Sequence, residues 1–595
     1  MVAARRACAV ALFVAVVVMA PACRGSFSSS AEEREEEIRS KQKKRMSGII
    51  IPGFASTQLR AWSILDCPYS PLDFNPLDLV WLDTTKLLSA VNCWLKCMML
   101  DPYNQTDHPE CRSRPDSGLS AVTELDPGYI TGPLSSVWKE WVKWCIEFGV
   151  EPNAIIAAPY DWRLSPAMLE ERDLYFHNLK ITFETAVKLR GAPTLVFAHS
   201  LGNHVFRYFL EWLKLEIAPK HYTEWLDHHI HAYFAVGSPL LGAIEAVKCT
   251  LIGNTFGLPI SEGTARLMYN SFASSLWMLP FSKNCRSETM YSKHFSGRNR
   301  KAAHHIYHCE EEEFRSNYSG WPTNIVNIEI PSVRGVDAYP SVTDVAEFNM
   351  SSMECGLPTQ LSFSALEIAD GTFFKAVEDY DPDSERLLYQ LKSYHDDSVL
   401  NPLTPWDRPP IKNVFCIYGI DSKTEVGYYF APSGKPYPDN WIITDVIYEV
   451  EGSLFSRSGN LVEGNPGATS GDETVPYHSL SWCKNWLGDK VNITRAPQVS
   501  FTAFMNIKWN IVRSPILMRE IWLQMWHDIH PKAKSHFVTK AKRGPLRDDD
   551  CYWDYGKARC AWSEYCEYRY AFGDVHLGQS CRLKSASLDL LFHYI

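Results

Sequence analysis

The sequence is short of several features, and each shortage excludes a class of protein. Asp and Glu outnumber Lys and Arg, and the formal net charge of −10 argues against a nucleic-acid partner. No Cys-x-x-Cys pair has histidines at zinc spacing, so no metal site is expected. No motif implies an organic cofactor. After residue 20, no apolar run approaches the ~20 residues that a membrane-spanning helix needs.

Residues 1–24 have the pattern of a secretory signal peptide. Arg5 and Arg6 precede an apolar run of about 14 residues, from Ala7 to Ala20, and small residues that suit cleavage follow it. The run is short for a membrane span, so a cleaved signal is favoured over an anchor. A charge-rich stretch at 25–46 is then most simply a solvated linker before the fold.

Cysteine content and glycosylation sequons agree with a secretory route. The chain has 17 cysteines, which suits an oxidising compartment where disulfides persist. Cys93 and Cys97 are separated by three residues, a spacing that favours disulfides or core packing over metal binding. Four Asn-x-Ser/Thr sequons begin at Asn104, Asn317, Asn349 and Asn492.

Strand-like and helix-like segments alternate along the chain. Amphipathic helices are predicted at 137–148 and 174–189. Short apolar runs rich in β-branched residues predict buried strands at 48–51, 154–158, 194–198, 232–236 and 414–418. This alternation is typical of βαβ units, and it predicts an α/β fold with a mostly parallel sheet.

Two parts of the chain depart from this rhythm. Residues 245–400 are rich in Ser, Asn, charged and aromatic residues, and we interpret them as a cap subdomain inserted into the sheet connections. The main domain then spans 47–530. Residues 531–595 form a Cys-rich tail, in which two local disulfides are possible and the pairing is left open. The tail's cysteines are Cys551, Cys560, Cys566 and Cys581.

Ser200 lies at the centre of the motif that carries the most information. The strand-like run at 194–198 continues into AHSLG (198–202), and a helical pattern starts immediately afterwards. A strand, a tight turn with serine at its apex, and a helix form the nucleophile elbow of α/β-hydrolases. Ala198 replaces the first glycine of the consensus and is small enough for the same close packing. The motif predicts a serine that forms an acyl-enzyme.

The rest of a serine-hydrolase site has candidates at the expected points of the chain. Backbone amides of Leu201 and Phe54 are the expected oxyanion donors, because one follows the nucleophile and the other follows the first strand. Asp472 lies in the turn SGDETVP (470–476), downstream of the strand at 414–418, and is the expected triad acid. The alternative is a turn aspartate that bonds only its own backbone.

The triad histidine is what this sequence lacks. It belongs between the last strand (499–505) and the last helix, which begins at Ser514, yet residues 506–513 contain no histidine. One explanation is a splice variant or gene-model error that removes a segment between about Gln498 and Asn510. The other is a rearranged base, while His199 is expected to point away from the nucleophile. Candidates for a rearranged base are His478, His527 and His530.

Six motifs in one order resemble the lecithin–cholesterol acyltransferase family. They are IPG (51–53), WLD (81–83), CW (93–94), PYDWR (159–163), AHSLG (198–202) and GDETV (471–475). The resemblance runs from residue 48 to about 480. The segment 53–104, PYDWR and the Cys-rich tail most resemble the plant phospholipid–sterol acyltransferases. The resemblance implies an α/β-hydrolase fold and a lid at 54–104 closed by a Cys67–Cys93 disulfide. It also implies that Ser200 is the nucleophile and Asp472 the triad acid.

The resemblance also implies a reaction and its participants. A fatty acyl group would pass from a glycerophospholipid to a sterol, giving steryl ester and lysophospholipid at a membrane surface. The expected location is the endoplasmic reticulum lumen or the microsomal membrane. Phospholipase A and phospholipid:diacylglycerol acyltransferase activities are alternatives. Because the histidine is missing, a catalytically silent lipid-binding isoform is a further alternative.

Overall fold

The structure of the chain is a computed structural model. It describes residues 46–282, 285–291, 303–309, 321–330, 359–463, 469–487 and 498–505, apart from 69, 71, 130, 148, 149 and 323. The predicted signal peptide, the linker up to residue 45 and the Cys-rich tail lie outside the described residues. So do the loop at 506–513 and three of the four sequons. Among the described residues, no helix is both long and apolar enough to cross a membrane.

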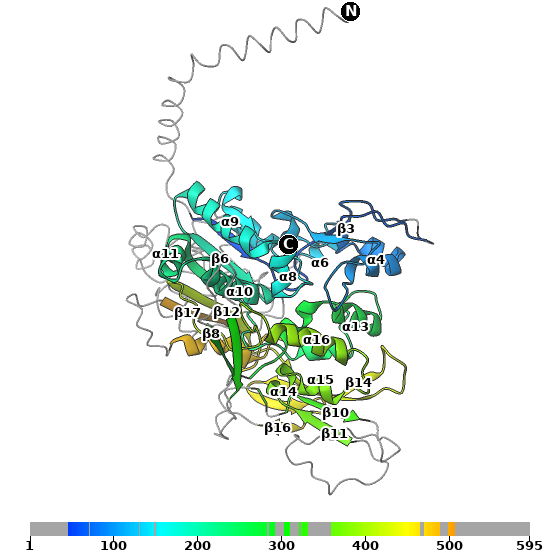
Figure 1. Ribbon diagram of the computed structural model, residues 1–595. Helices are drawn as coiled ribbons and strands as arrows, with labels where there is room; N and C mark the ends of the chain where they lie inside the picture. The colour runs from blue at the N-terminus through cyan, green and yellow to red at the C-terminus, as the bar shows by residue number, and fades with distance from the viewer. Residues whose placement is uncertain are drawn as a thin grey trace, which may run out of the picture.

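A six-stranded sheet forms the centre of the molecule (Figure 1), in the order β17-β12-β7-β6-β1-β5. Every pair of neighbours is parallel, which explains the short, nearly continuous apolar runs in the sequence. The sheet confirms the predicted α/β-hydrolase fold. Its strands are β1 (Gly48–Ile51), β5 (Ile155–Ala157), β6 (Thr194–His199), β7 (Ile230–Val236), β12 (Asn413–Ile420) and β17 (Gln498–Met505).

Helices pack on this sheet. α10 follows β6 directly and contacts both β6 and β1, while α9 contacts β6 and α11 contacts β7. The predicted helices at 137–148 and 174–189 are confirmed as α7 and α9. The bounds are α7 (Lys139–Glu147), α9 (Tyr175–Arg190), α10 (Leu201–Glu216) and α11 (Pro219–His229).

A second sheet lies below the first in Figure 1, in the order β11-β10-β13-β14-β15-β16. Its strands come from both sides of β12, so the inserted elements extend to residue 463 as well as through the expected cap at 245–400. The strands are β10 (Val326–Ile330), β11 (Thr359–Phe363), β13 (Thr424–Pro432), β14 (Trp441–Val450), β15 (Ser453–Ser456) and β16 (Leu461–Glu463).

Helices and one separate hairpin complete the inserted part of the chain. The helices are α12 (Glu245–Leu251), α13 (Glu262–Asn270), α14 (Ala365–Ala369), α15 (Thr372–Ala376) and α16 (Ser384–His395). The hairpin pairs β8 (Cys285–Tyr291) with β9 (Ala303–Cys309) in antiparallel register.

The predicted lid segment, residues 54–104, is short strands and helices cross-linked by disulfides. The expected disulfide between Cys67 and Cys93 is present, with a Cα–Cα distance of 5.9 Å. A second disulfide joins Cys97 to Cys111, with a Cα–Cα distance of 4.9 Å. Cys93 and Cys97 are therefore both disulfide-bonded, to different partners. The elements of the segment are β2 (Leu59–Ala61), β3 (Leu79–Trp81), α3 (Thr84–Ser89) and α4 (Val91–Met98), and β4 (Ser113–Pro115), beyond the segment, pairs with β2.

The PYDWR motif connects the central sheet to the lid segment through buried charge. Asp161 and Arg163 are both fully buried, and Arg163 Nη2 lies 2.7 Å from Asp161 Oδ2. Arg163 Nη1 also donates to the carbonyl oxygens of Cys97 (3.2 Å) and Met98 (2.9 Å). Burial alone would raise the pKa of Asp161, but the guanidiniums of Arg163 and Arg172 hold it well below its usual range.

Removing the charge of Arg163 should destabilise the whole fold. Arg163→Met leaves Asp161 with one buried cation and two lid carbonyls without their donor, a loss of ~3–5 kcal/mol. We expect a lower midpoint of thermal and denaturant unfolding. The control is Lys214→Met on α10, where the ion pair with Glu211 has side-chain exposures of 43% and 29%, so the midpoint should barely move. Equal effects in the two variants would contradict this interpretation.

Candidate active site

Ser200 lies between β6 and α10, at the apex of a tight turn. Its φ and ψ are 49° and −124°, a positive φ that non-glycine residues rarely adopt. The turn is held from beneath, because Asn203 Nδ2 donates to the Ser200 carbonyl oxygen at 2.9 Å and to that of Val236 at 3.3 Å. Tyr233 in turn donates its hydroxyl to Asn203 Oδ1 at 2.6 Å. This is the strand–turn–helix geometry that the AHSLG motif predicts.

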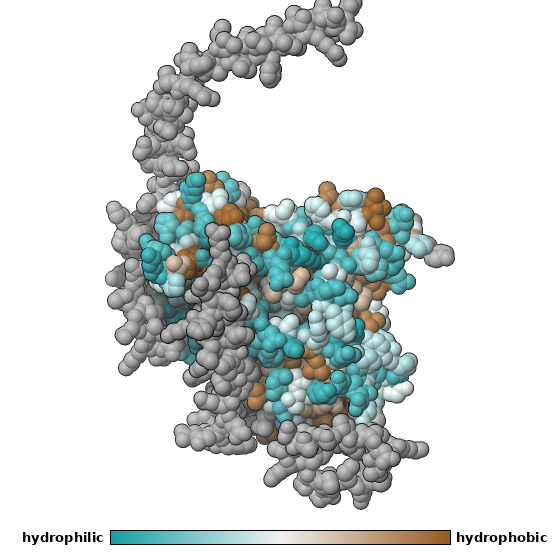
Figure 2. Space-filling model, viewed as in Figure 1, coloured by the Kyte–Doolittle hydropathy of each residue, from teal (hydrophilic) through white to brown (hydrophobic). Residues whose placement is uncertain are grey.

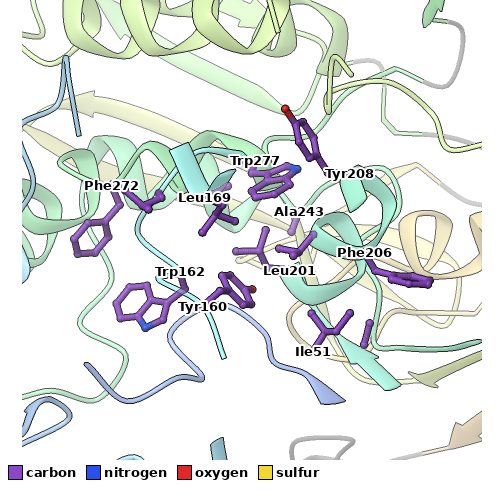
Figure 3. Packing of buried hydrophobic residues seen from close by; sticks show 14 of the residues in the cluster. Ile51, Tyr160, Trp162, Leu169, Leu201, Phe206, Tyr208, Ala243, Phe272 and Trp277 are labelled. Carbon is purple, nitrogen blue, oxygen red and sulfur yellow. The ribbon is translucent and has the colours of Figure 1, made fainter. Parts of the chain in front are cut away.

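The end of β1 packs directly on this turn, and two glycines make the approach possible. A Cβ on Gly202 would lie 2.5 Å from the carbonyl oxygen of Ile51 and 2.6 Å from that of Pro52. A Cβ on Gly53 would lie 3.1 Å from Ser200 Cβ. Figure 3 shows Ile51 and Leu201 within the buried cluster at this junction. The turn after β1 and the serine are therefore in contact.

The two predicted oxyanion donors lie in segments that adjoin Ser200, the first turn of α10 and the turn after β1. Leu201 is the first residue of α10, where backbone amides have no acceptor within the helix. Phe54 follows Gly53 in the turn after β1, and its ring contacts Trp162 of PYDWR with centroids 5.0 Å apart. Tyr160 donates its hydroxyl to the Pro52 carbonyl oxygen at 2.9 Å. PYDWR thus supports the turn that carries Phe54, and Figure 3 shows its Tyr160 and Trp162 within the buried cluster.

Asp472 lies at the carboxyl end of β12. A Cβ on Gly419, near the end of β12, would lie 3.0 Å from Asp472 Cβ. Asp472 Oδ1 accepts the backbone amides of Thr474 (3.2 Å) and Val475 (2.8 Å), so the turn bonding that we considered as the alternative is also present. Burial raises the pKa of Asp472 to about 6, and these amides partly oppose the shift.

The separation of Ser200 and Asp472 leaves room for one intervening side chain. Ser200 follows β6, Asp472 lies against the end of β12, and β7 is the strand between β6 and β12. Two strand spacings amount to about 10 Å between backbones. In a serine triad an imidazole bridges the gap between the nucleophile and the acid.

The described histidines occupy different positions around this site. A Cβ on Gly53 would lie 3.0 Å from His199 Nδ1, which places the ring beneath the turn after β1. Burial lowers the pKa of His199 to about 4, so its ring is neutral. His478 lies in α17 (Tyr477–Leu480), where it is buried with its ring centroid 4.2 Å from that of Trp321. The two other candidate bases lie outside the described residues.

A buried carboxylate that the sequence did not single out supports the Asp472 loop. Glu449, near the end of β14, accepts the backbone amides of Gly471 and Tyr477 at Oε2, each at 3.1 Å. Its side chain is 1% exposed, and burial raises its pKa to about 7. A lone glutamate near the end of a strand carries no motif, which is why sequence reasoning missed it. In the described part of the chain, no group of three or more His, Cys, Asp or Glu could hold a metal ion.

Adding one methyl group at Gly202 should separate the serine from the turn after β1. The new Cβ of Gly202→Ala would meet backbone oxygens that cannot move independently, so α10 must shift. We expect the rate of Ser200 labelling by a fluorophosphonate to fall by at least tenfold.

Gly132→Ala is the matched control for that variant. Its Cβ would meet the Glu124 carboxylate at 3.1 Å, and a flexible side chain can rotate away. Labelling should therefore stay at the wild-type rate in this variant. An unchanged rate in Gly202→Ala would show that the close packing is irrelevant to the site.

The raised pKa of Glu449 predicts how stability depends on pH. The folded state binds this proton more tightly than the unfolded chain, whose value is near 4.5. The resulting stabilisation is complete below that value and is lost as pH rises through about 7. Relative to Glu449→Gln, the wild type should lose ~3 kcal/mol between these limits, as judged by denaturant unfolding. If the unfolding free energies of the wild type and Glu449→Gln changed in parallel with pH, the raised pKa of Glu449 would be contradicted.

Comparison with known proteins agrees with the motifs. The family model "Lecithin:cholesterol acyltransferase" matches residues 76–506. Phospholipid–sterol O-acyltransferase of Arabidopsis thaliana is 68% identical over 635 aligned residues, covering 98% of this chain and 99% of that protein. Phospholipid:diacylglycerol acyltransferase of Schizosaccharomyces pombe is 25% identical, covering 73% and 62%. The resemblance predicted from six motifs is confirmed, and the chain belongs to the lecithin:cholesterol acyltransferase family.

Proposed function

We propose that this chain transfers a fatty acyl group from a glycerophospholipid to a sterol, through an acyl-enzyme on Ser200. The observation that carries the proposal is the 68% identity to a phospholipid–sterol O-acyltransferase over nearly the full length of both proteins. Relatives that use diacylglycerol share far less, at 25% and 24% identity. The Ser200 turn supplies the chemistry, since its geometry is that of a nucleophile elbow.

The reaction has two balanced halves. In the first, Ser200 Oγ attacks the ester carbonyl carbon of the phospholipid, and its proton passes through a base to the departing lysophospholipid oxygen. In the second, the sterol hydroxyl attacks the acyl-serine carbonyl, and Ser200 regains a proton as the steryl ester leaves. The amides of Leu201 and Phe54 stabilise both oxyanions. Asp472 orients the base and stabilises its cationic form.

The base belongs after β17, and one observation supports the view that a segment is missing there. The family match ends at Asn506, the residue that follows β17. The 635 aligned residues exceed the 595 of this chain, so the Arabidopsis protein contains residues somewhere along its length that this chain lacks. Loss of a triad member lowers the rate about 10⁴-fold. A deleted base is therefore favoured over a rearranged base. Such a deletion would make this chain a catalytically silent, lipid-binding isoform.

A membrane surface is the proposed place of action. Several large apolar side chains of the lid segment are more than half exposed, and Figure 2 shows hydrophobic residues among hydrophilic ones on this part of the surface. Exposed apolar groups of this kind are stabilised when they enter the acyl region of a bilayer. These side chains are Trp62 (59%), Ile64 (66%), Leu77 (59%) and Leu88 (69%).

We propose the endoplasmic reticulum lumen or the microsomal membrane as the location. The signal-like residues 1–24 support an entry into the secretory pathway. The disulfides Cys67–Cys93 and Cys97–Cys111 support an oxidising compartment.

An assay of steryl ester formation tests the function. Two proteins are incubated with acyl-labelled phosphatidylethanolamine and sterol: this chain, and this chain completed with the Arabidopsis segment between Gln498 and Asn510. We expect the completed chain to form steryl ester, its Ser200→Ala variant to form none, and the present chain to be slower by about 10⁴-fold.

The products distinguish the alternatives. Free fatty acid alone would establish phospholipase A, and labelled triacylglycerol on adding diacylglycerol would establish the second alternative. Full activity of the present chain would show that no segment needed for catalysis is missing. A rearranged base such as His478 would then be the remaining explanation. Inactivity of both proteins would favour the lipid-binding reading.

A further inference from the structure

The loop that carries Asp472 is fastened at both ends to one buried carboxylate. Gly471 precedes Asp472 and Tyr477 follows the turn, and both backbone amides donate to Glu449 Oε2 at 3.1 Å. Glu449 is separated from these residues by 22 and 28 positions in the sequence. One oxygen of β14 therefore fixes the two points at which the loop enters and leaves the site.

Hydrogen bonds with two other residues also bind the loop and the residues that follow it. Thr424 Oγ1, on β13 next to β14, accepts the amide of Glu473 at 3.0 Å. Beyond Tyr477, the hydroxyl of Ser479 donates to the Gly242 carbonyl oxygen at 2.7 Å and accepts the Leu241 amide at 3.0 Å. In both of these residues the contacting group is a hydroxyl. Glu449 differs from them because it holds the loop through a carboxylate.

A carboxylate at this place has an energetic cost that an ordinary strand residue would not have. Glu449 is 1% exposed, and burial of an ionised carboxyl group is unfavourable unless hydrogen bonds compensate it. The amides of Gly471 and Tyr477, on either side of the Asp472 turn, donate hydrogen bonds to Glu449. Hydrogen bonds to an ionised acceptor are stronger than those between neutral groups. The two hydrogen bonds to the loop offset part of the desolvation of Glu449, and burial still raises its pKa.

We propose that Glu449 is a positioning residue for acyl transfer, holding Asp472 over the end of β12 through the amides of Gly471 and Tyr477. The inference rests on the proposed role of Asp472 as the triad acid. Asp472 makes its own turn with Thr474 and Val475, so the turn itself persists without Glu449. Two backbone amides after β12 already bind this loop, since Asp421 donates to the Ser470 carbonyl oxygen (3.1 Å) and Ser422 to that of Gly471 (3.0 Å). Glu449 adds the connection to β14, and so helps to fix the place of the turn relative to the base.

The same strand provides a matched control. Asp445 lies on β14, and its Oδ1 also accepts two backbone amides, those of Val446 (2.8 Å) and Arg457 (2.9 Å). Neither amide belongs to the loop that carries Asp472. Removing Asp445 therefore removes an equivalent pair of hydrogen bonds without touching that loop.

Two measurements test the proposal on Glu449→Ala, Glu449→Gln and Asp445→Ala, each made in the chain completed with the Arabidopsis segment that supplies the base. The first is site-resolved hydrogen exchange at the Gly471 and Tyr477 amides. The second is the rate of Ser200 labelling by a fluorophosphonate as a function of its concentration. In Glu449→Ala we expect exchange to rise and the maximal labelling rate to fall, each at least tenfold, with an unchanged half-saturating concentration.

The conservative variant separates positioning from folding. Glu449→Gln keeps an oxygen for both amides, so it should restore most of the protection and of the labelling rate. Asp445→Ala should alter neither, even where its thermal midpoint falls as far as that of Glu449→Ala. A Glu449→Gln variant that behaves like Glu449→Ala would overturn the proposed acceptor role.

The remaining outcomes are equally decisive. Unchanged exchange in Glu449→Ala overturns the proposal whatever the activity of the chain. Raised exchange with an unchanged labelling rate shows that the loop is held but that its place does not matter to Ser200, which also overturns it. If Ser200 of the completed chain without further substitution is not labelled at all, the proposed function fails, and exchange alone then decides whether Glu449 holds the loop.

Discussion

The site depends on one close approach, that of the start of α10 to the end of β1. A Cβ at Gly202 would come within 2.5 Å of the Ile51 carbonyl oxygen, so only glycine lets the helix start there. That approach sets Ser200 against the turn that carries Phe54. The PYDWR segment fixes the turn from the other side, through the hydroxyl of Tyr160 and the ring of Trp162. The relative positions of the proposed nucleophile and oxyanion donors therefore depend on this single packing contact.

Three buried carboxylates that bear on the site, Asp161, Asp472 and Glu449, have pKa shifts of opposite direction. Asp161 lies between two arginines, which keep it ionised, and its work is to join the sheet to the lid segment. For Asp472 and Glu449, burial outweighs the backbone amides that bind them, and their pKa values rise to about 6 and 7. Raised values of this kind cluster at functional sites, because charge is kept there without full compensation.

The sequence was sufficient wherever the signal was local. All six central strands, two helices and the Ser200 turn are predictable, because parallel buried strands are continuous apolar runs and the elbow is a contiguous motif. The Cys67–Cys93 disulfide followed from family resemblance. The Cys97–Cys111 pairing and the role of Glu449 did not, since each depends on which distant backbone lies opposite. The second sheet was also missed as a sheet, because its strands come from both sides of β12.

The central claim is that Ser200 carries the acyl group between donor and acceptor. Peptide mass spectrometry of the chain completed with the Arabidopsis segment, quenched after incubation with phospholipid alone, tests this most directly. The account predicts a fatty acyl ester on the peptide that contains Ser200, and its loss when sterol is added before the quench. An acyl group on another residue, or an unmodified Ser200 while steryl ester accumulates, would contradict it.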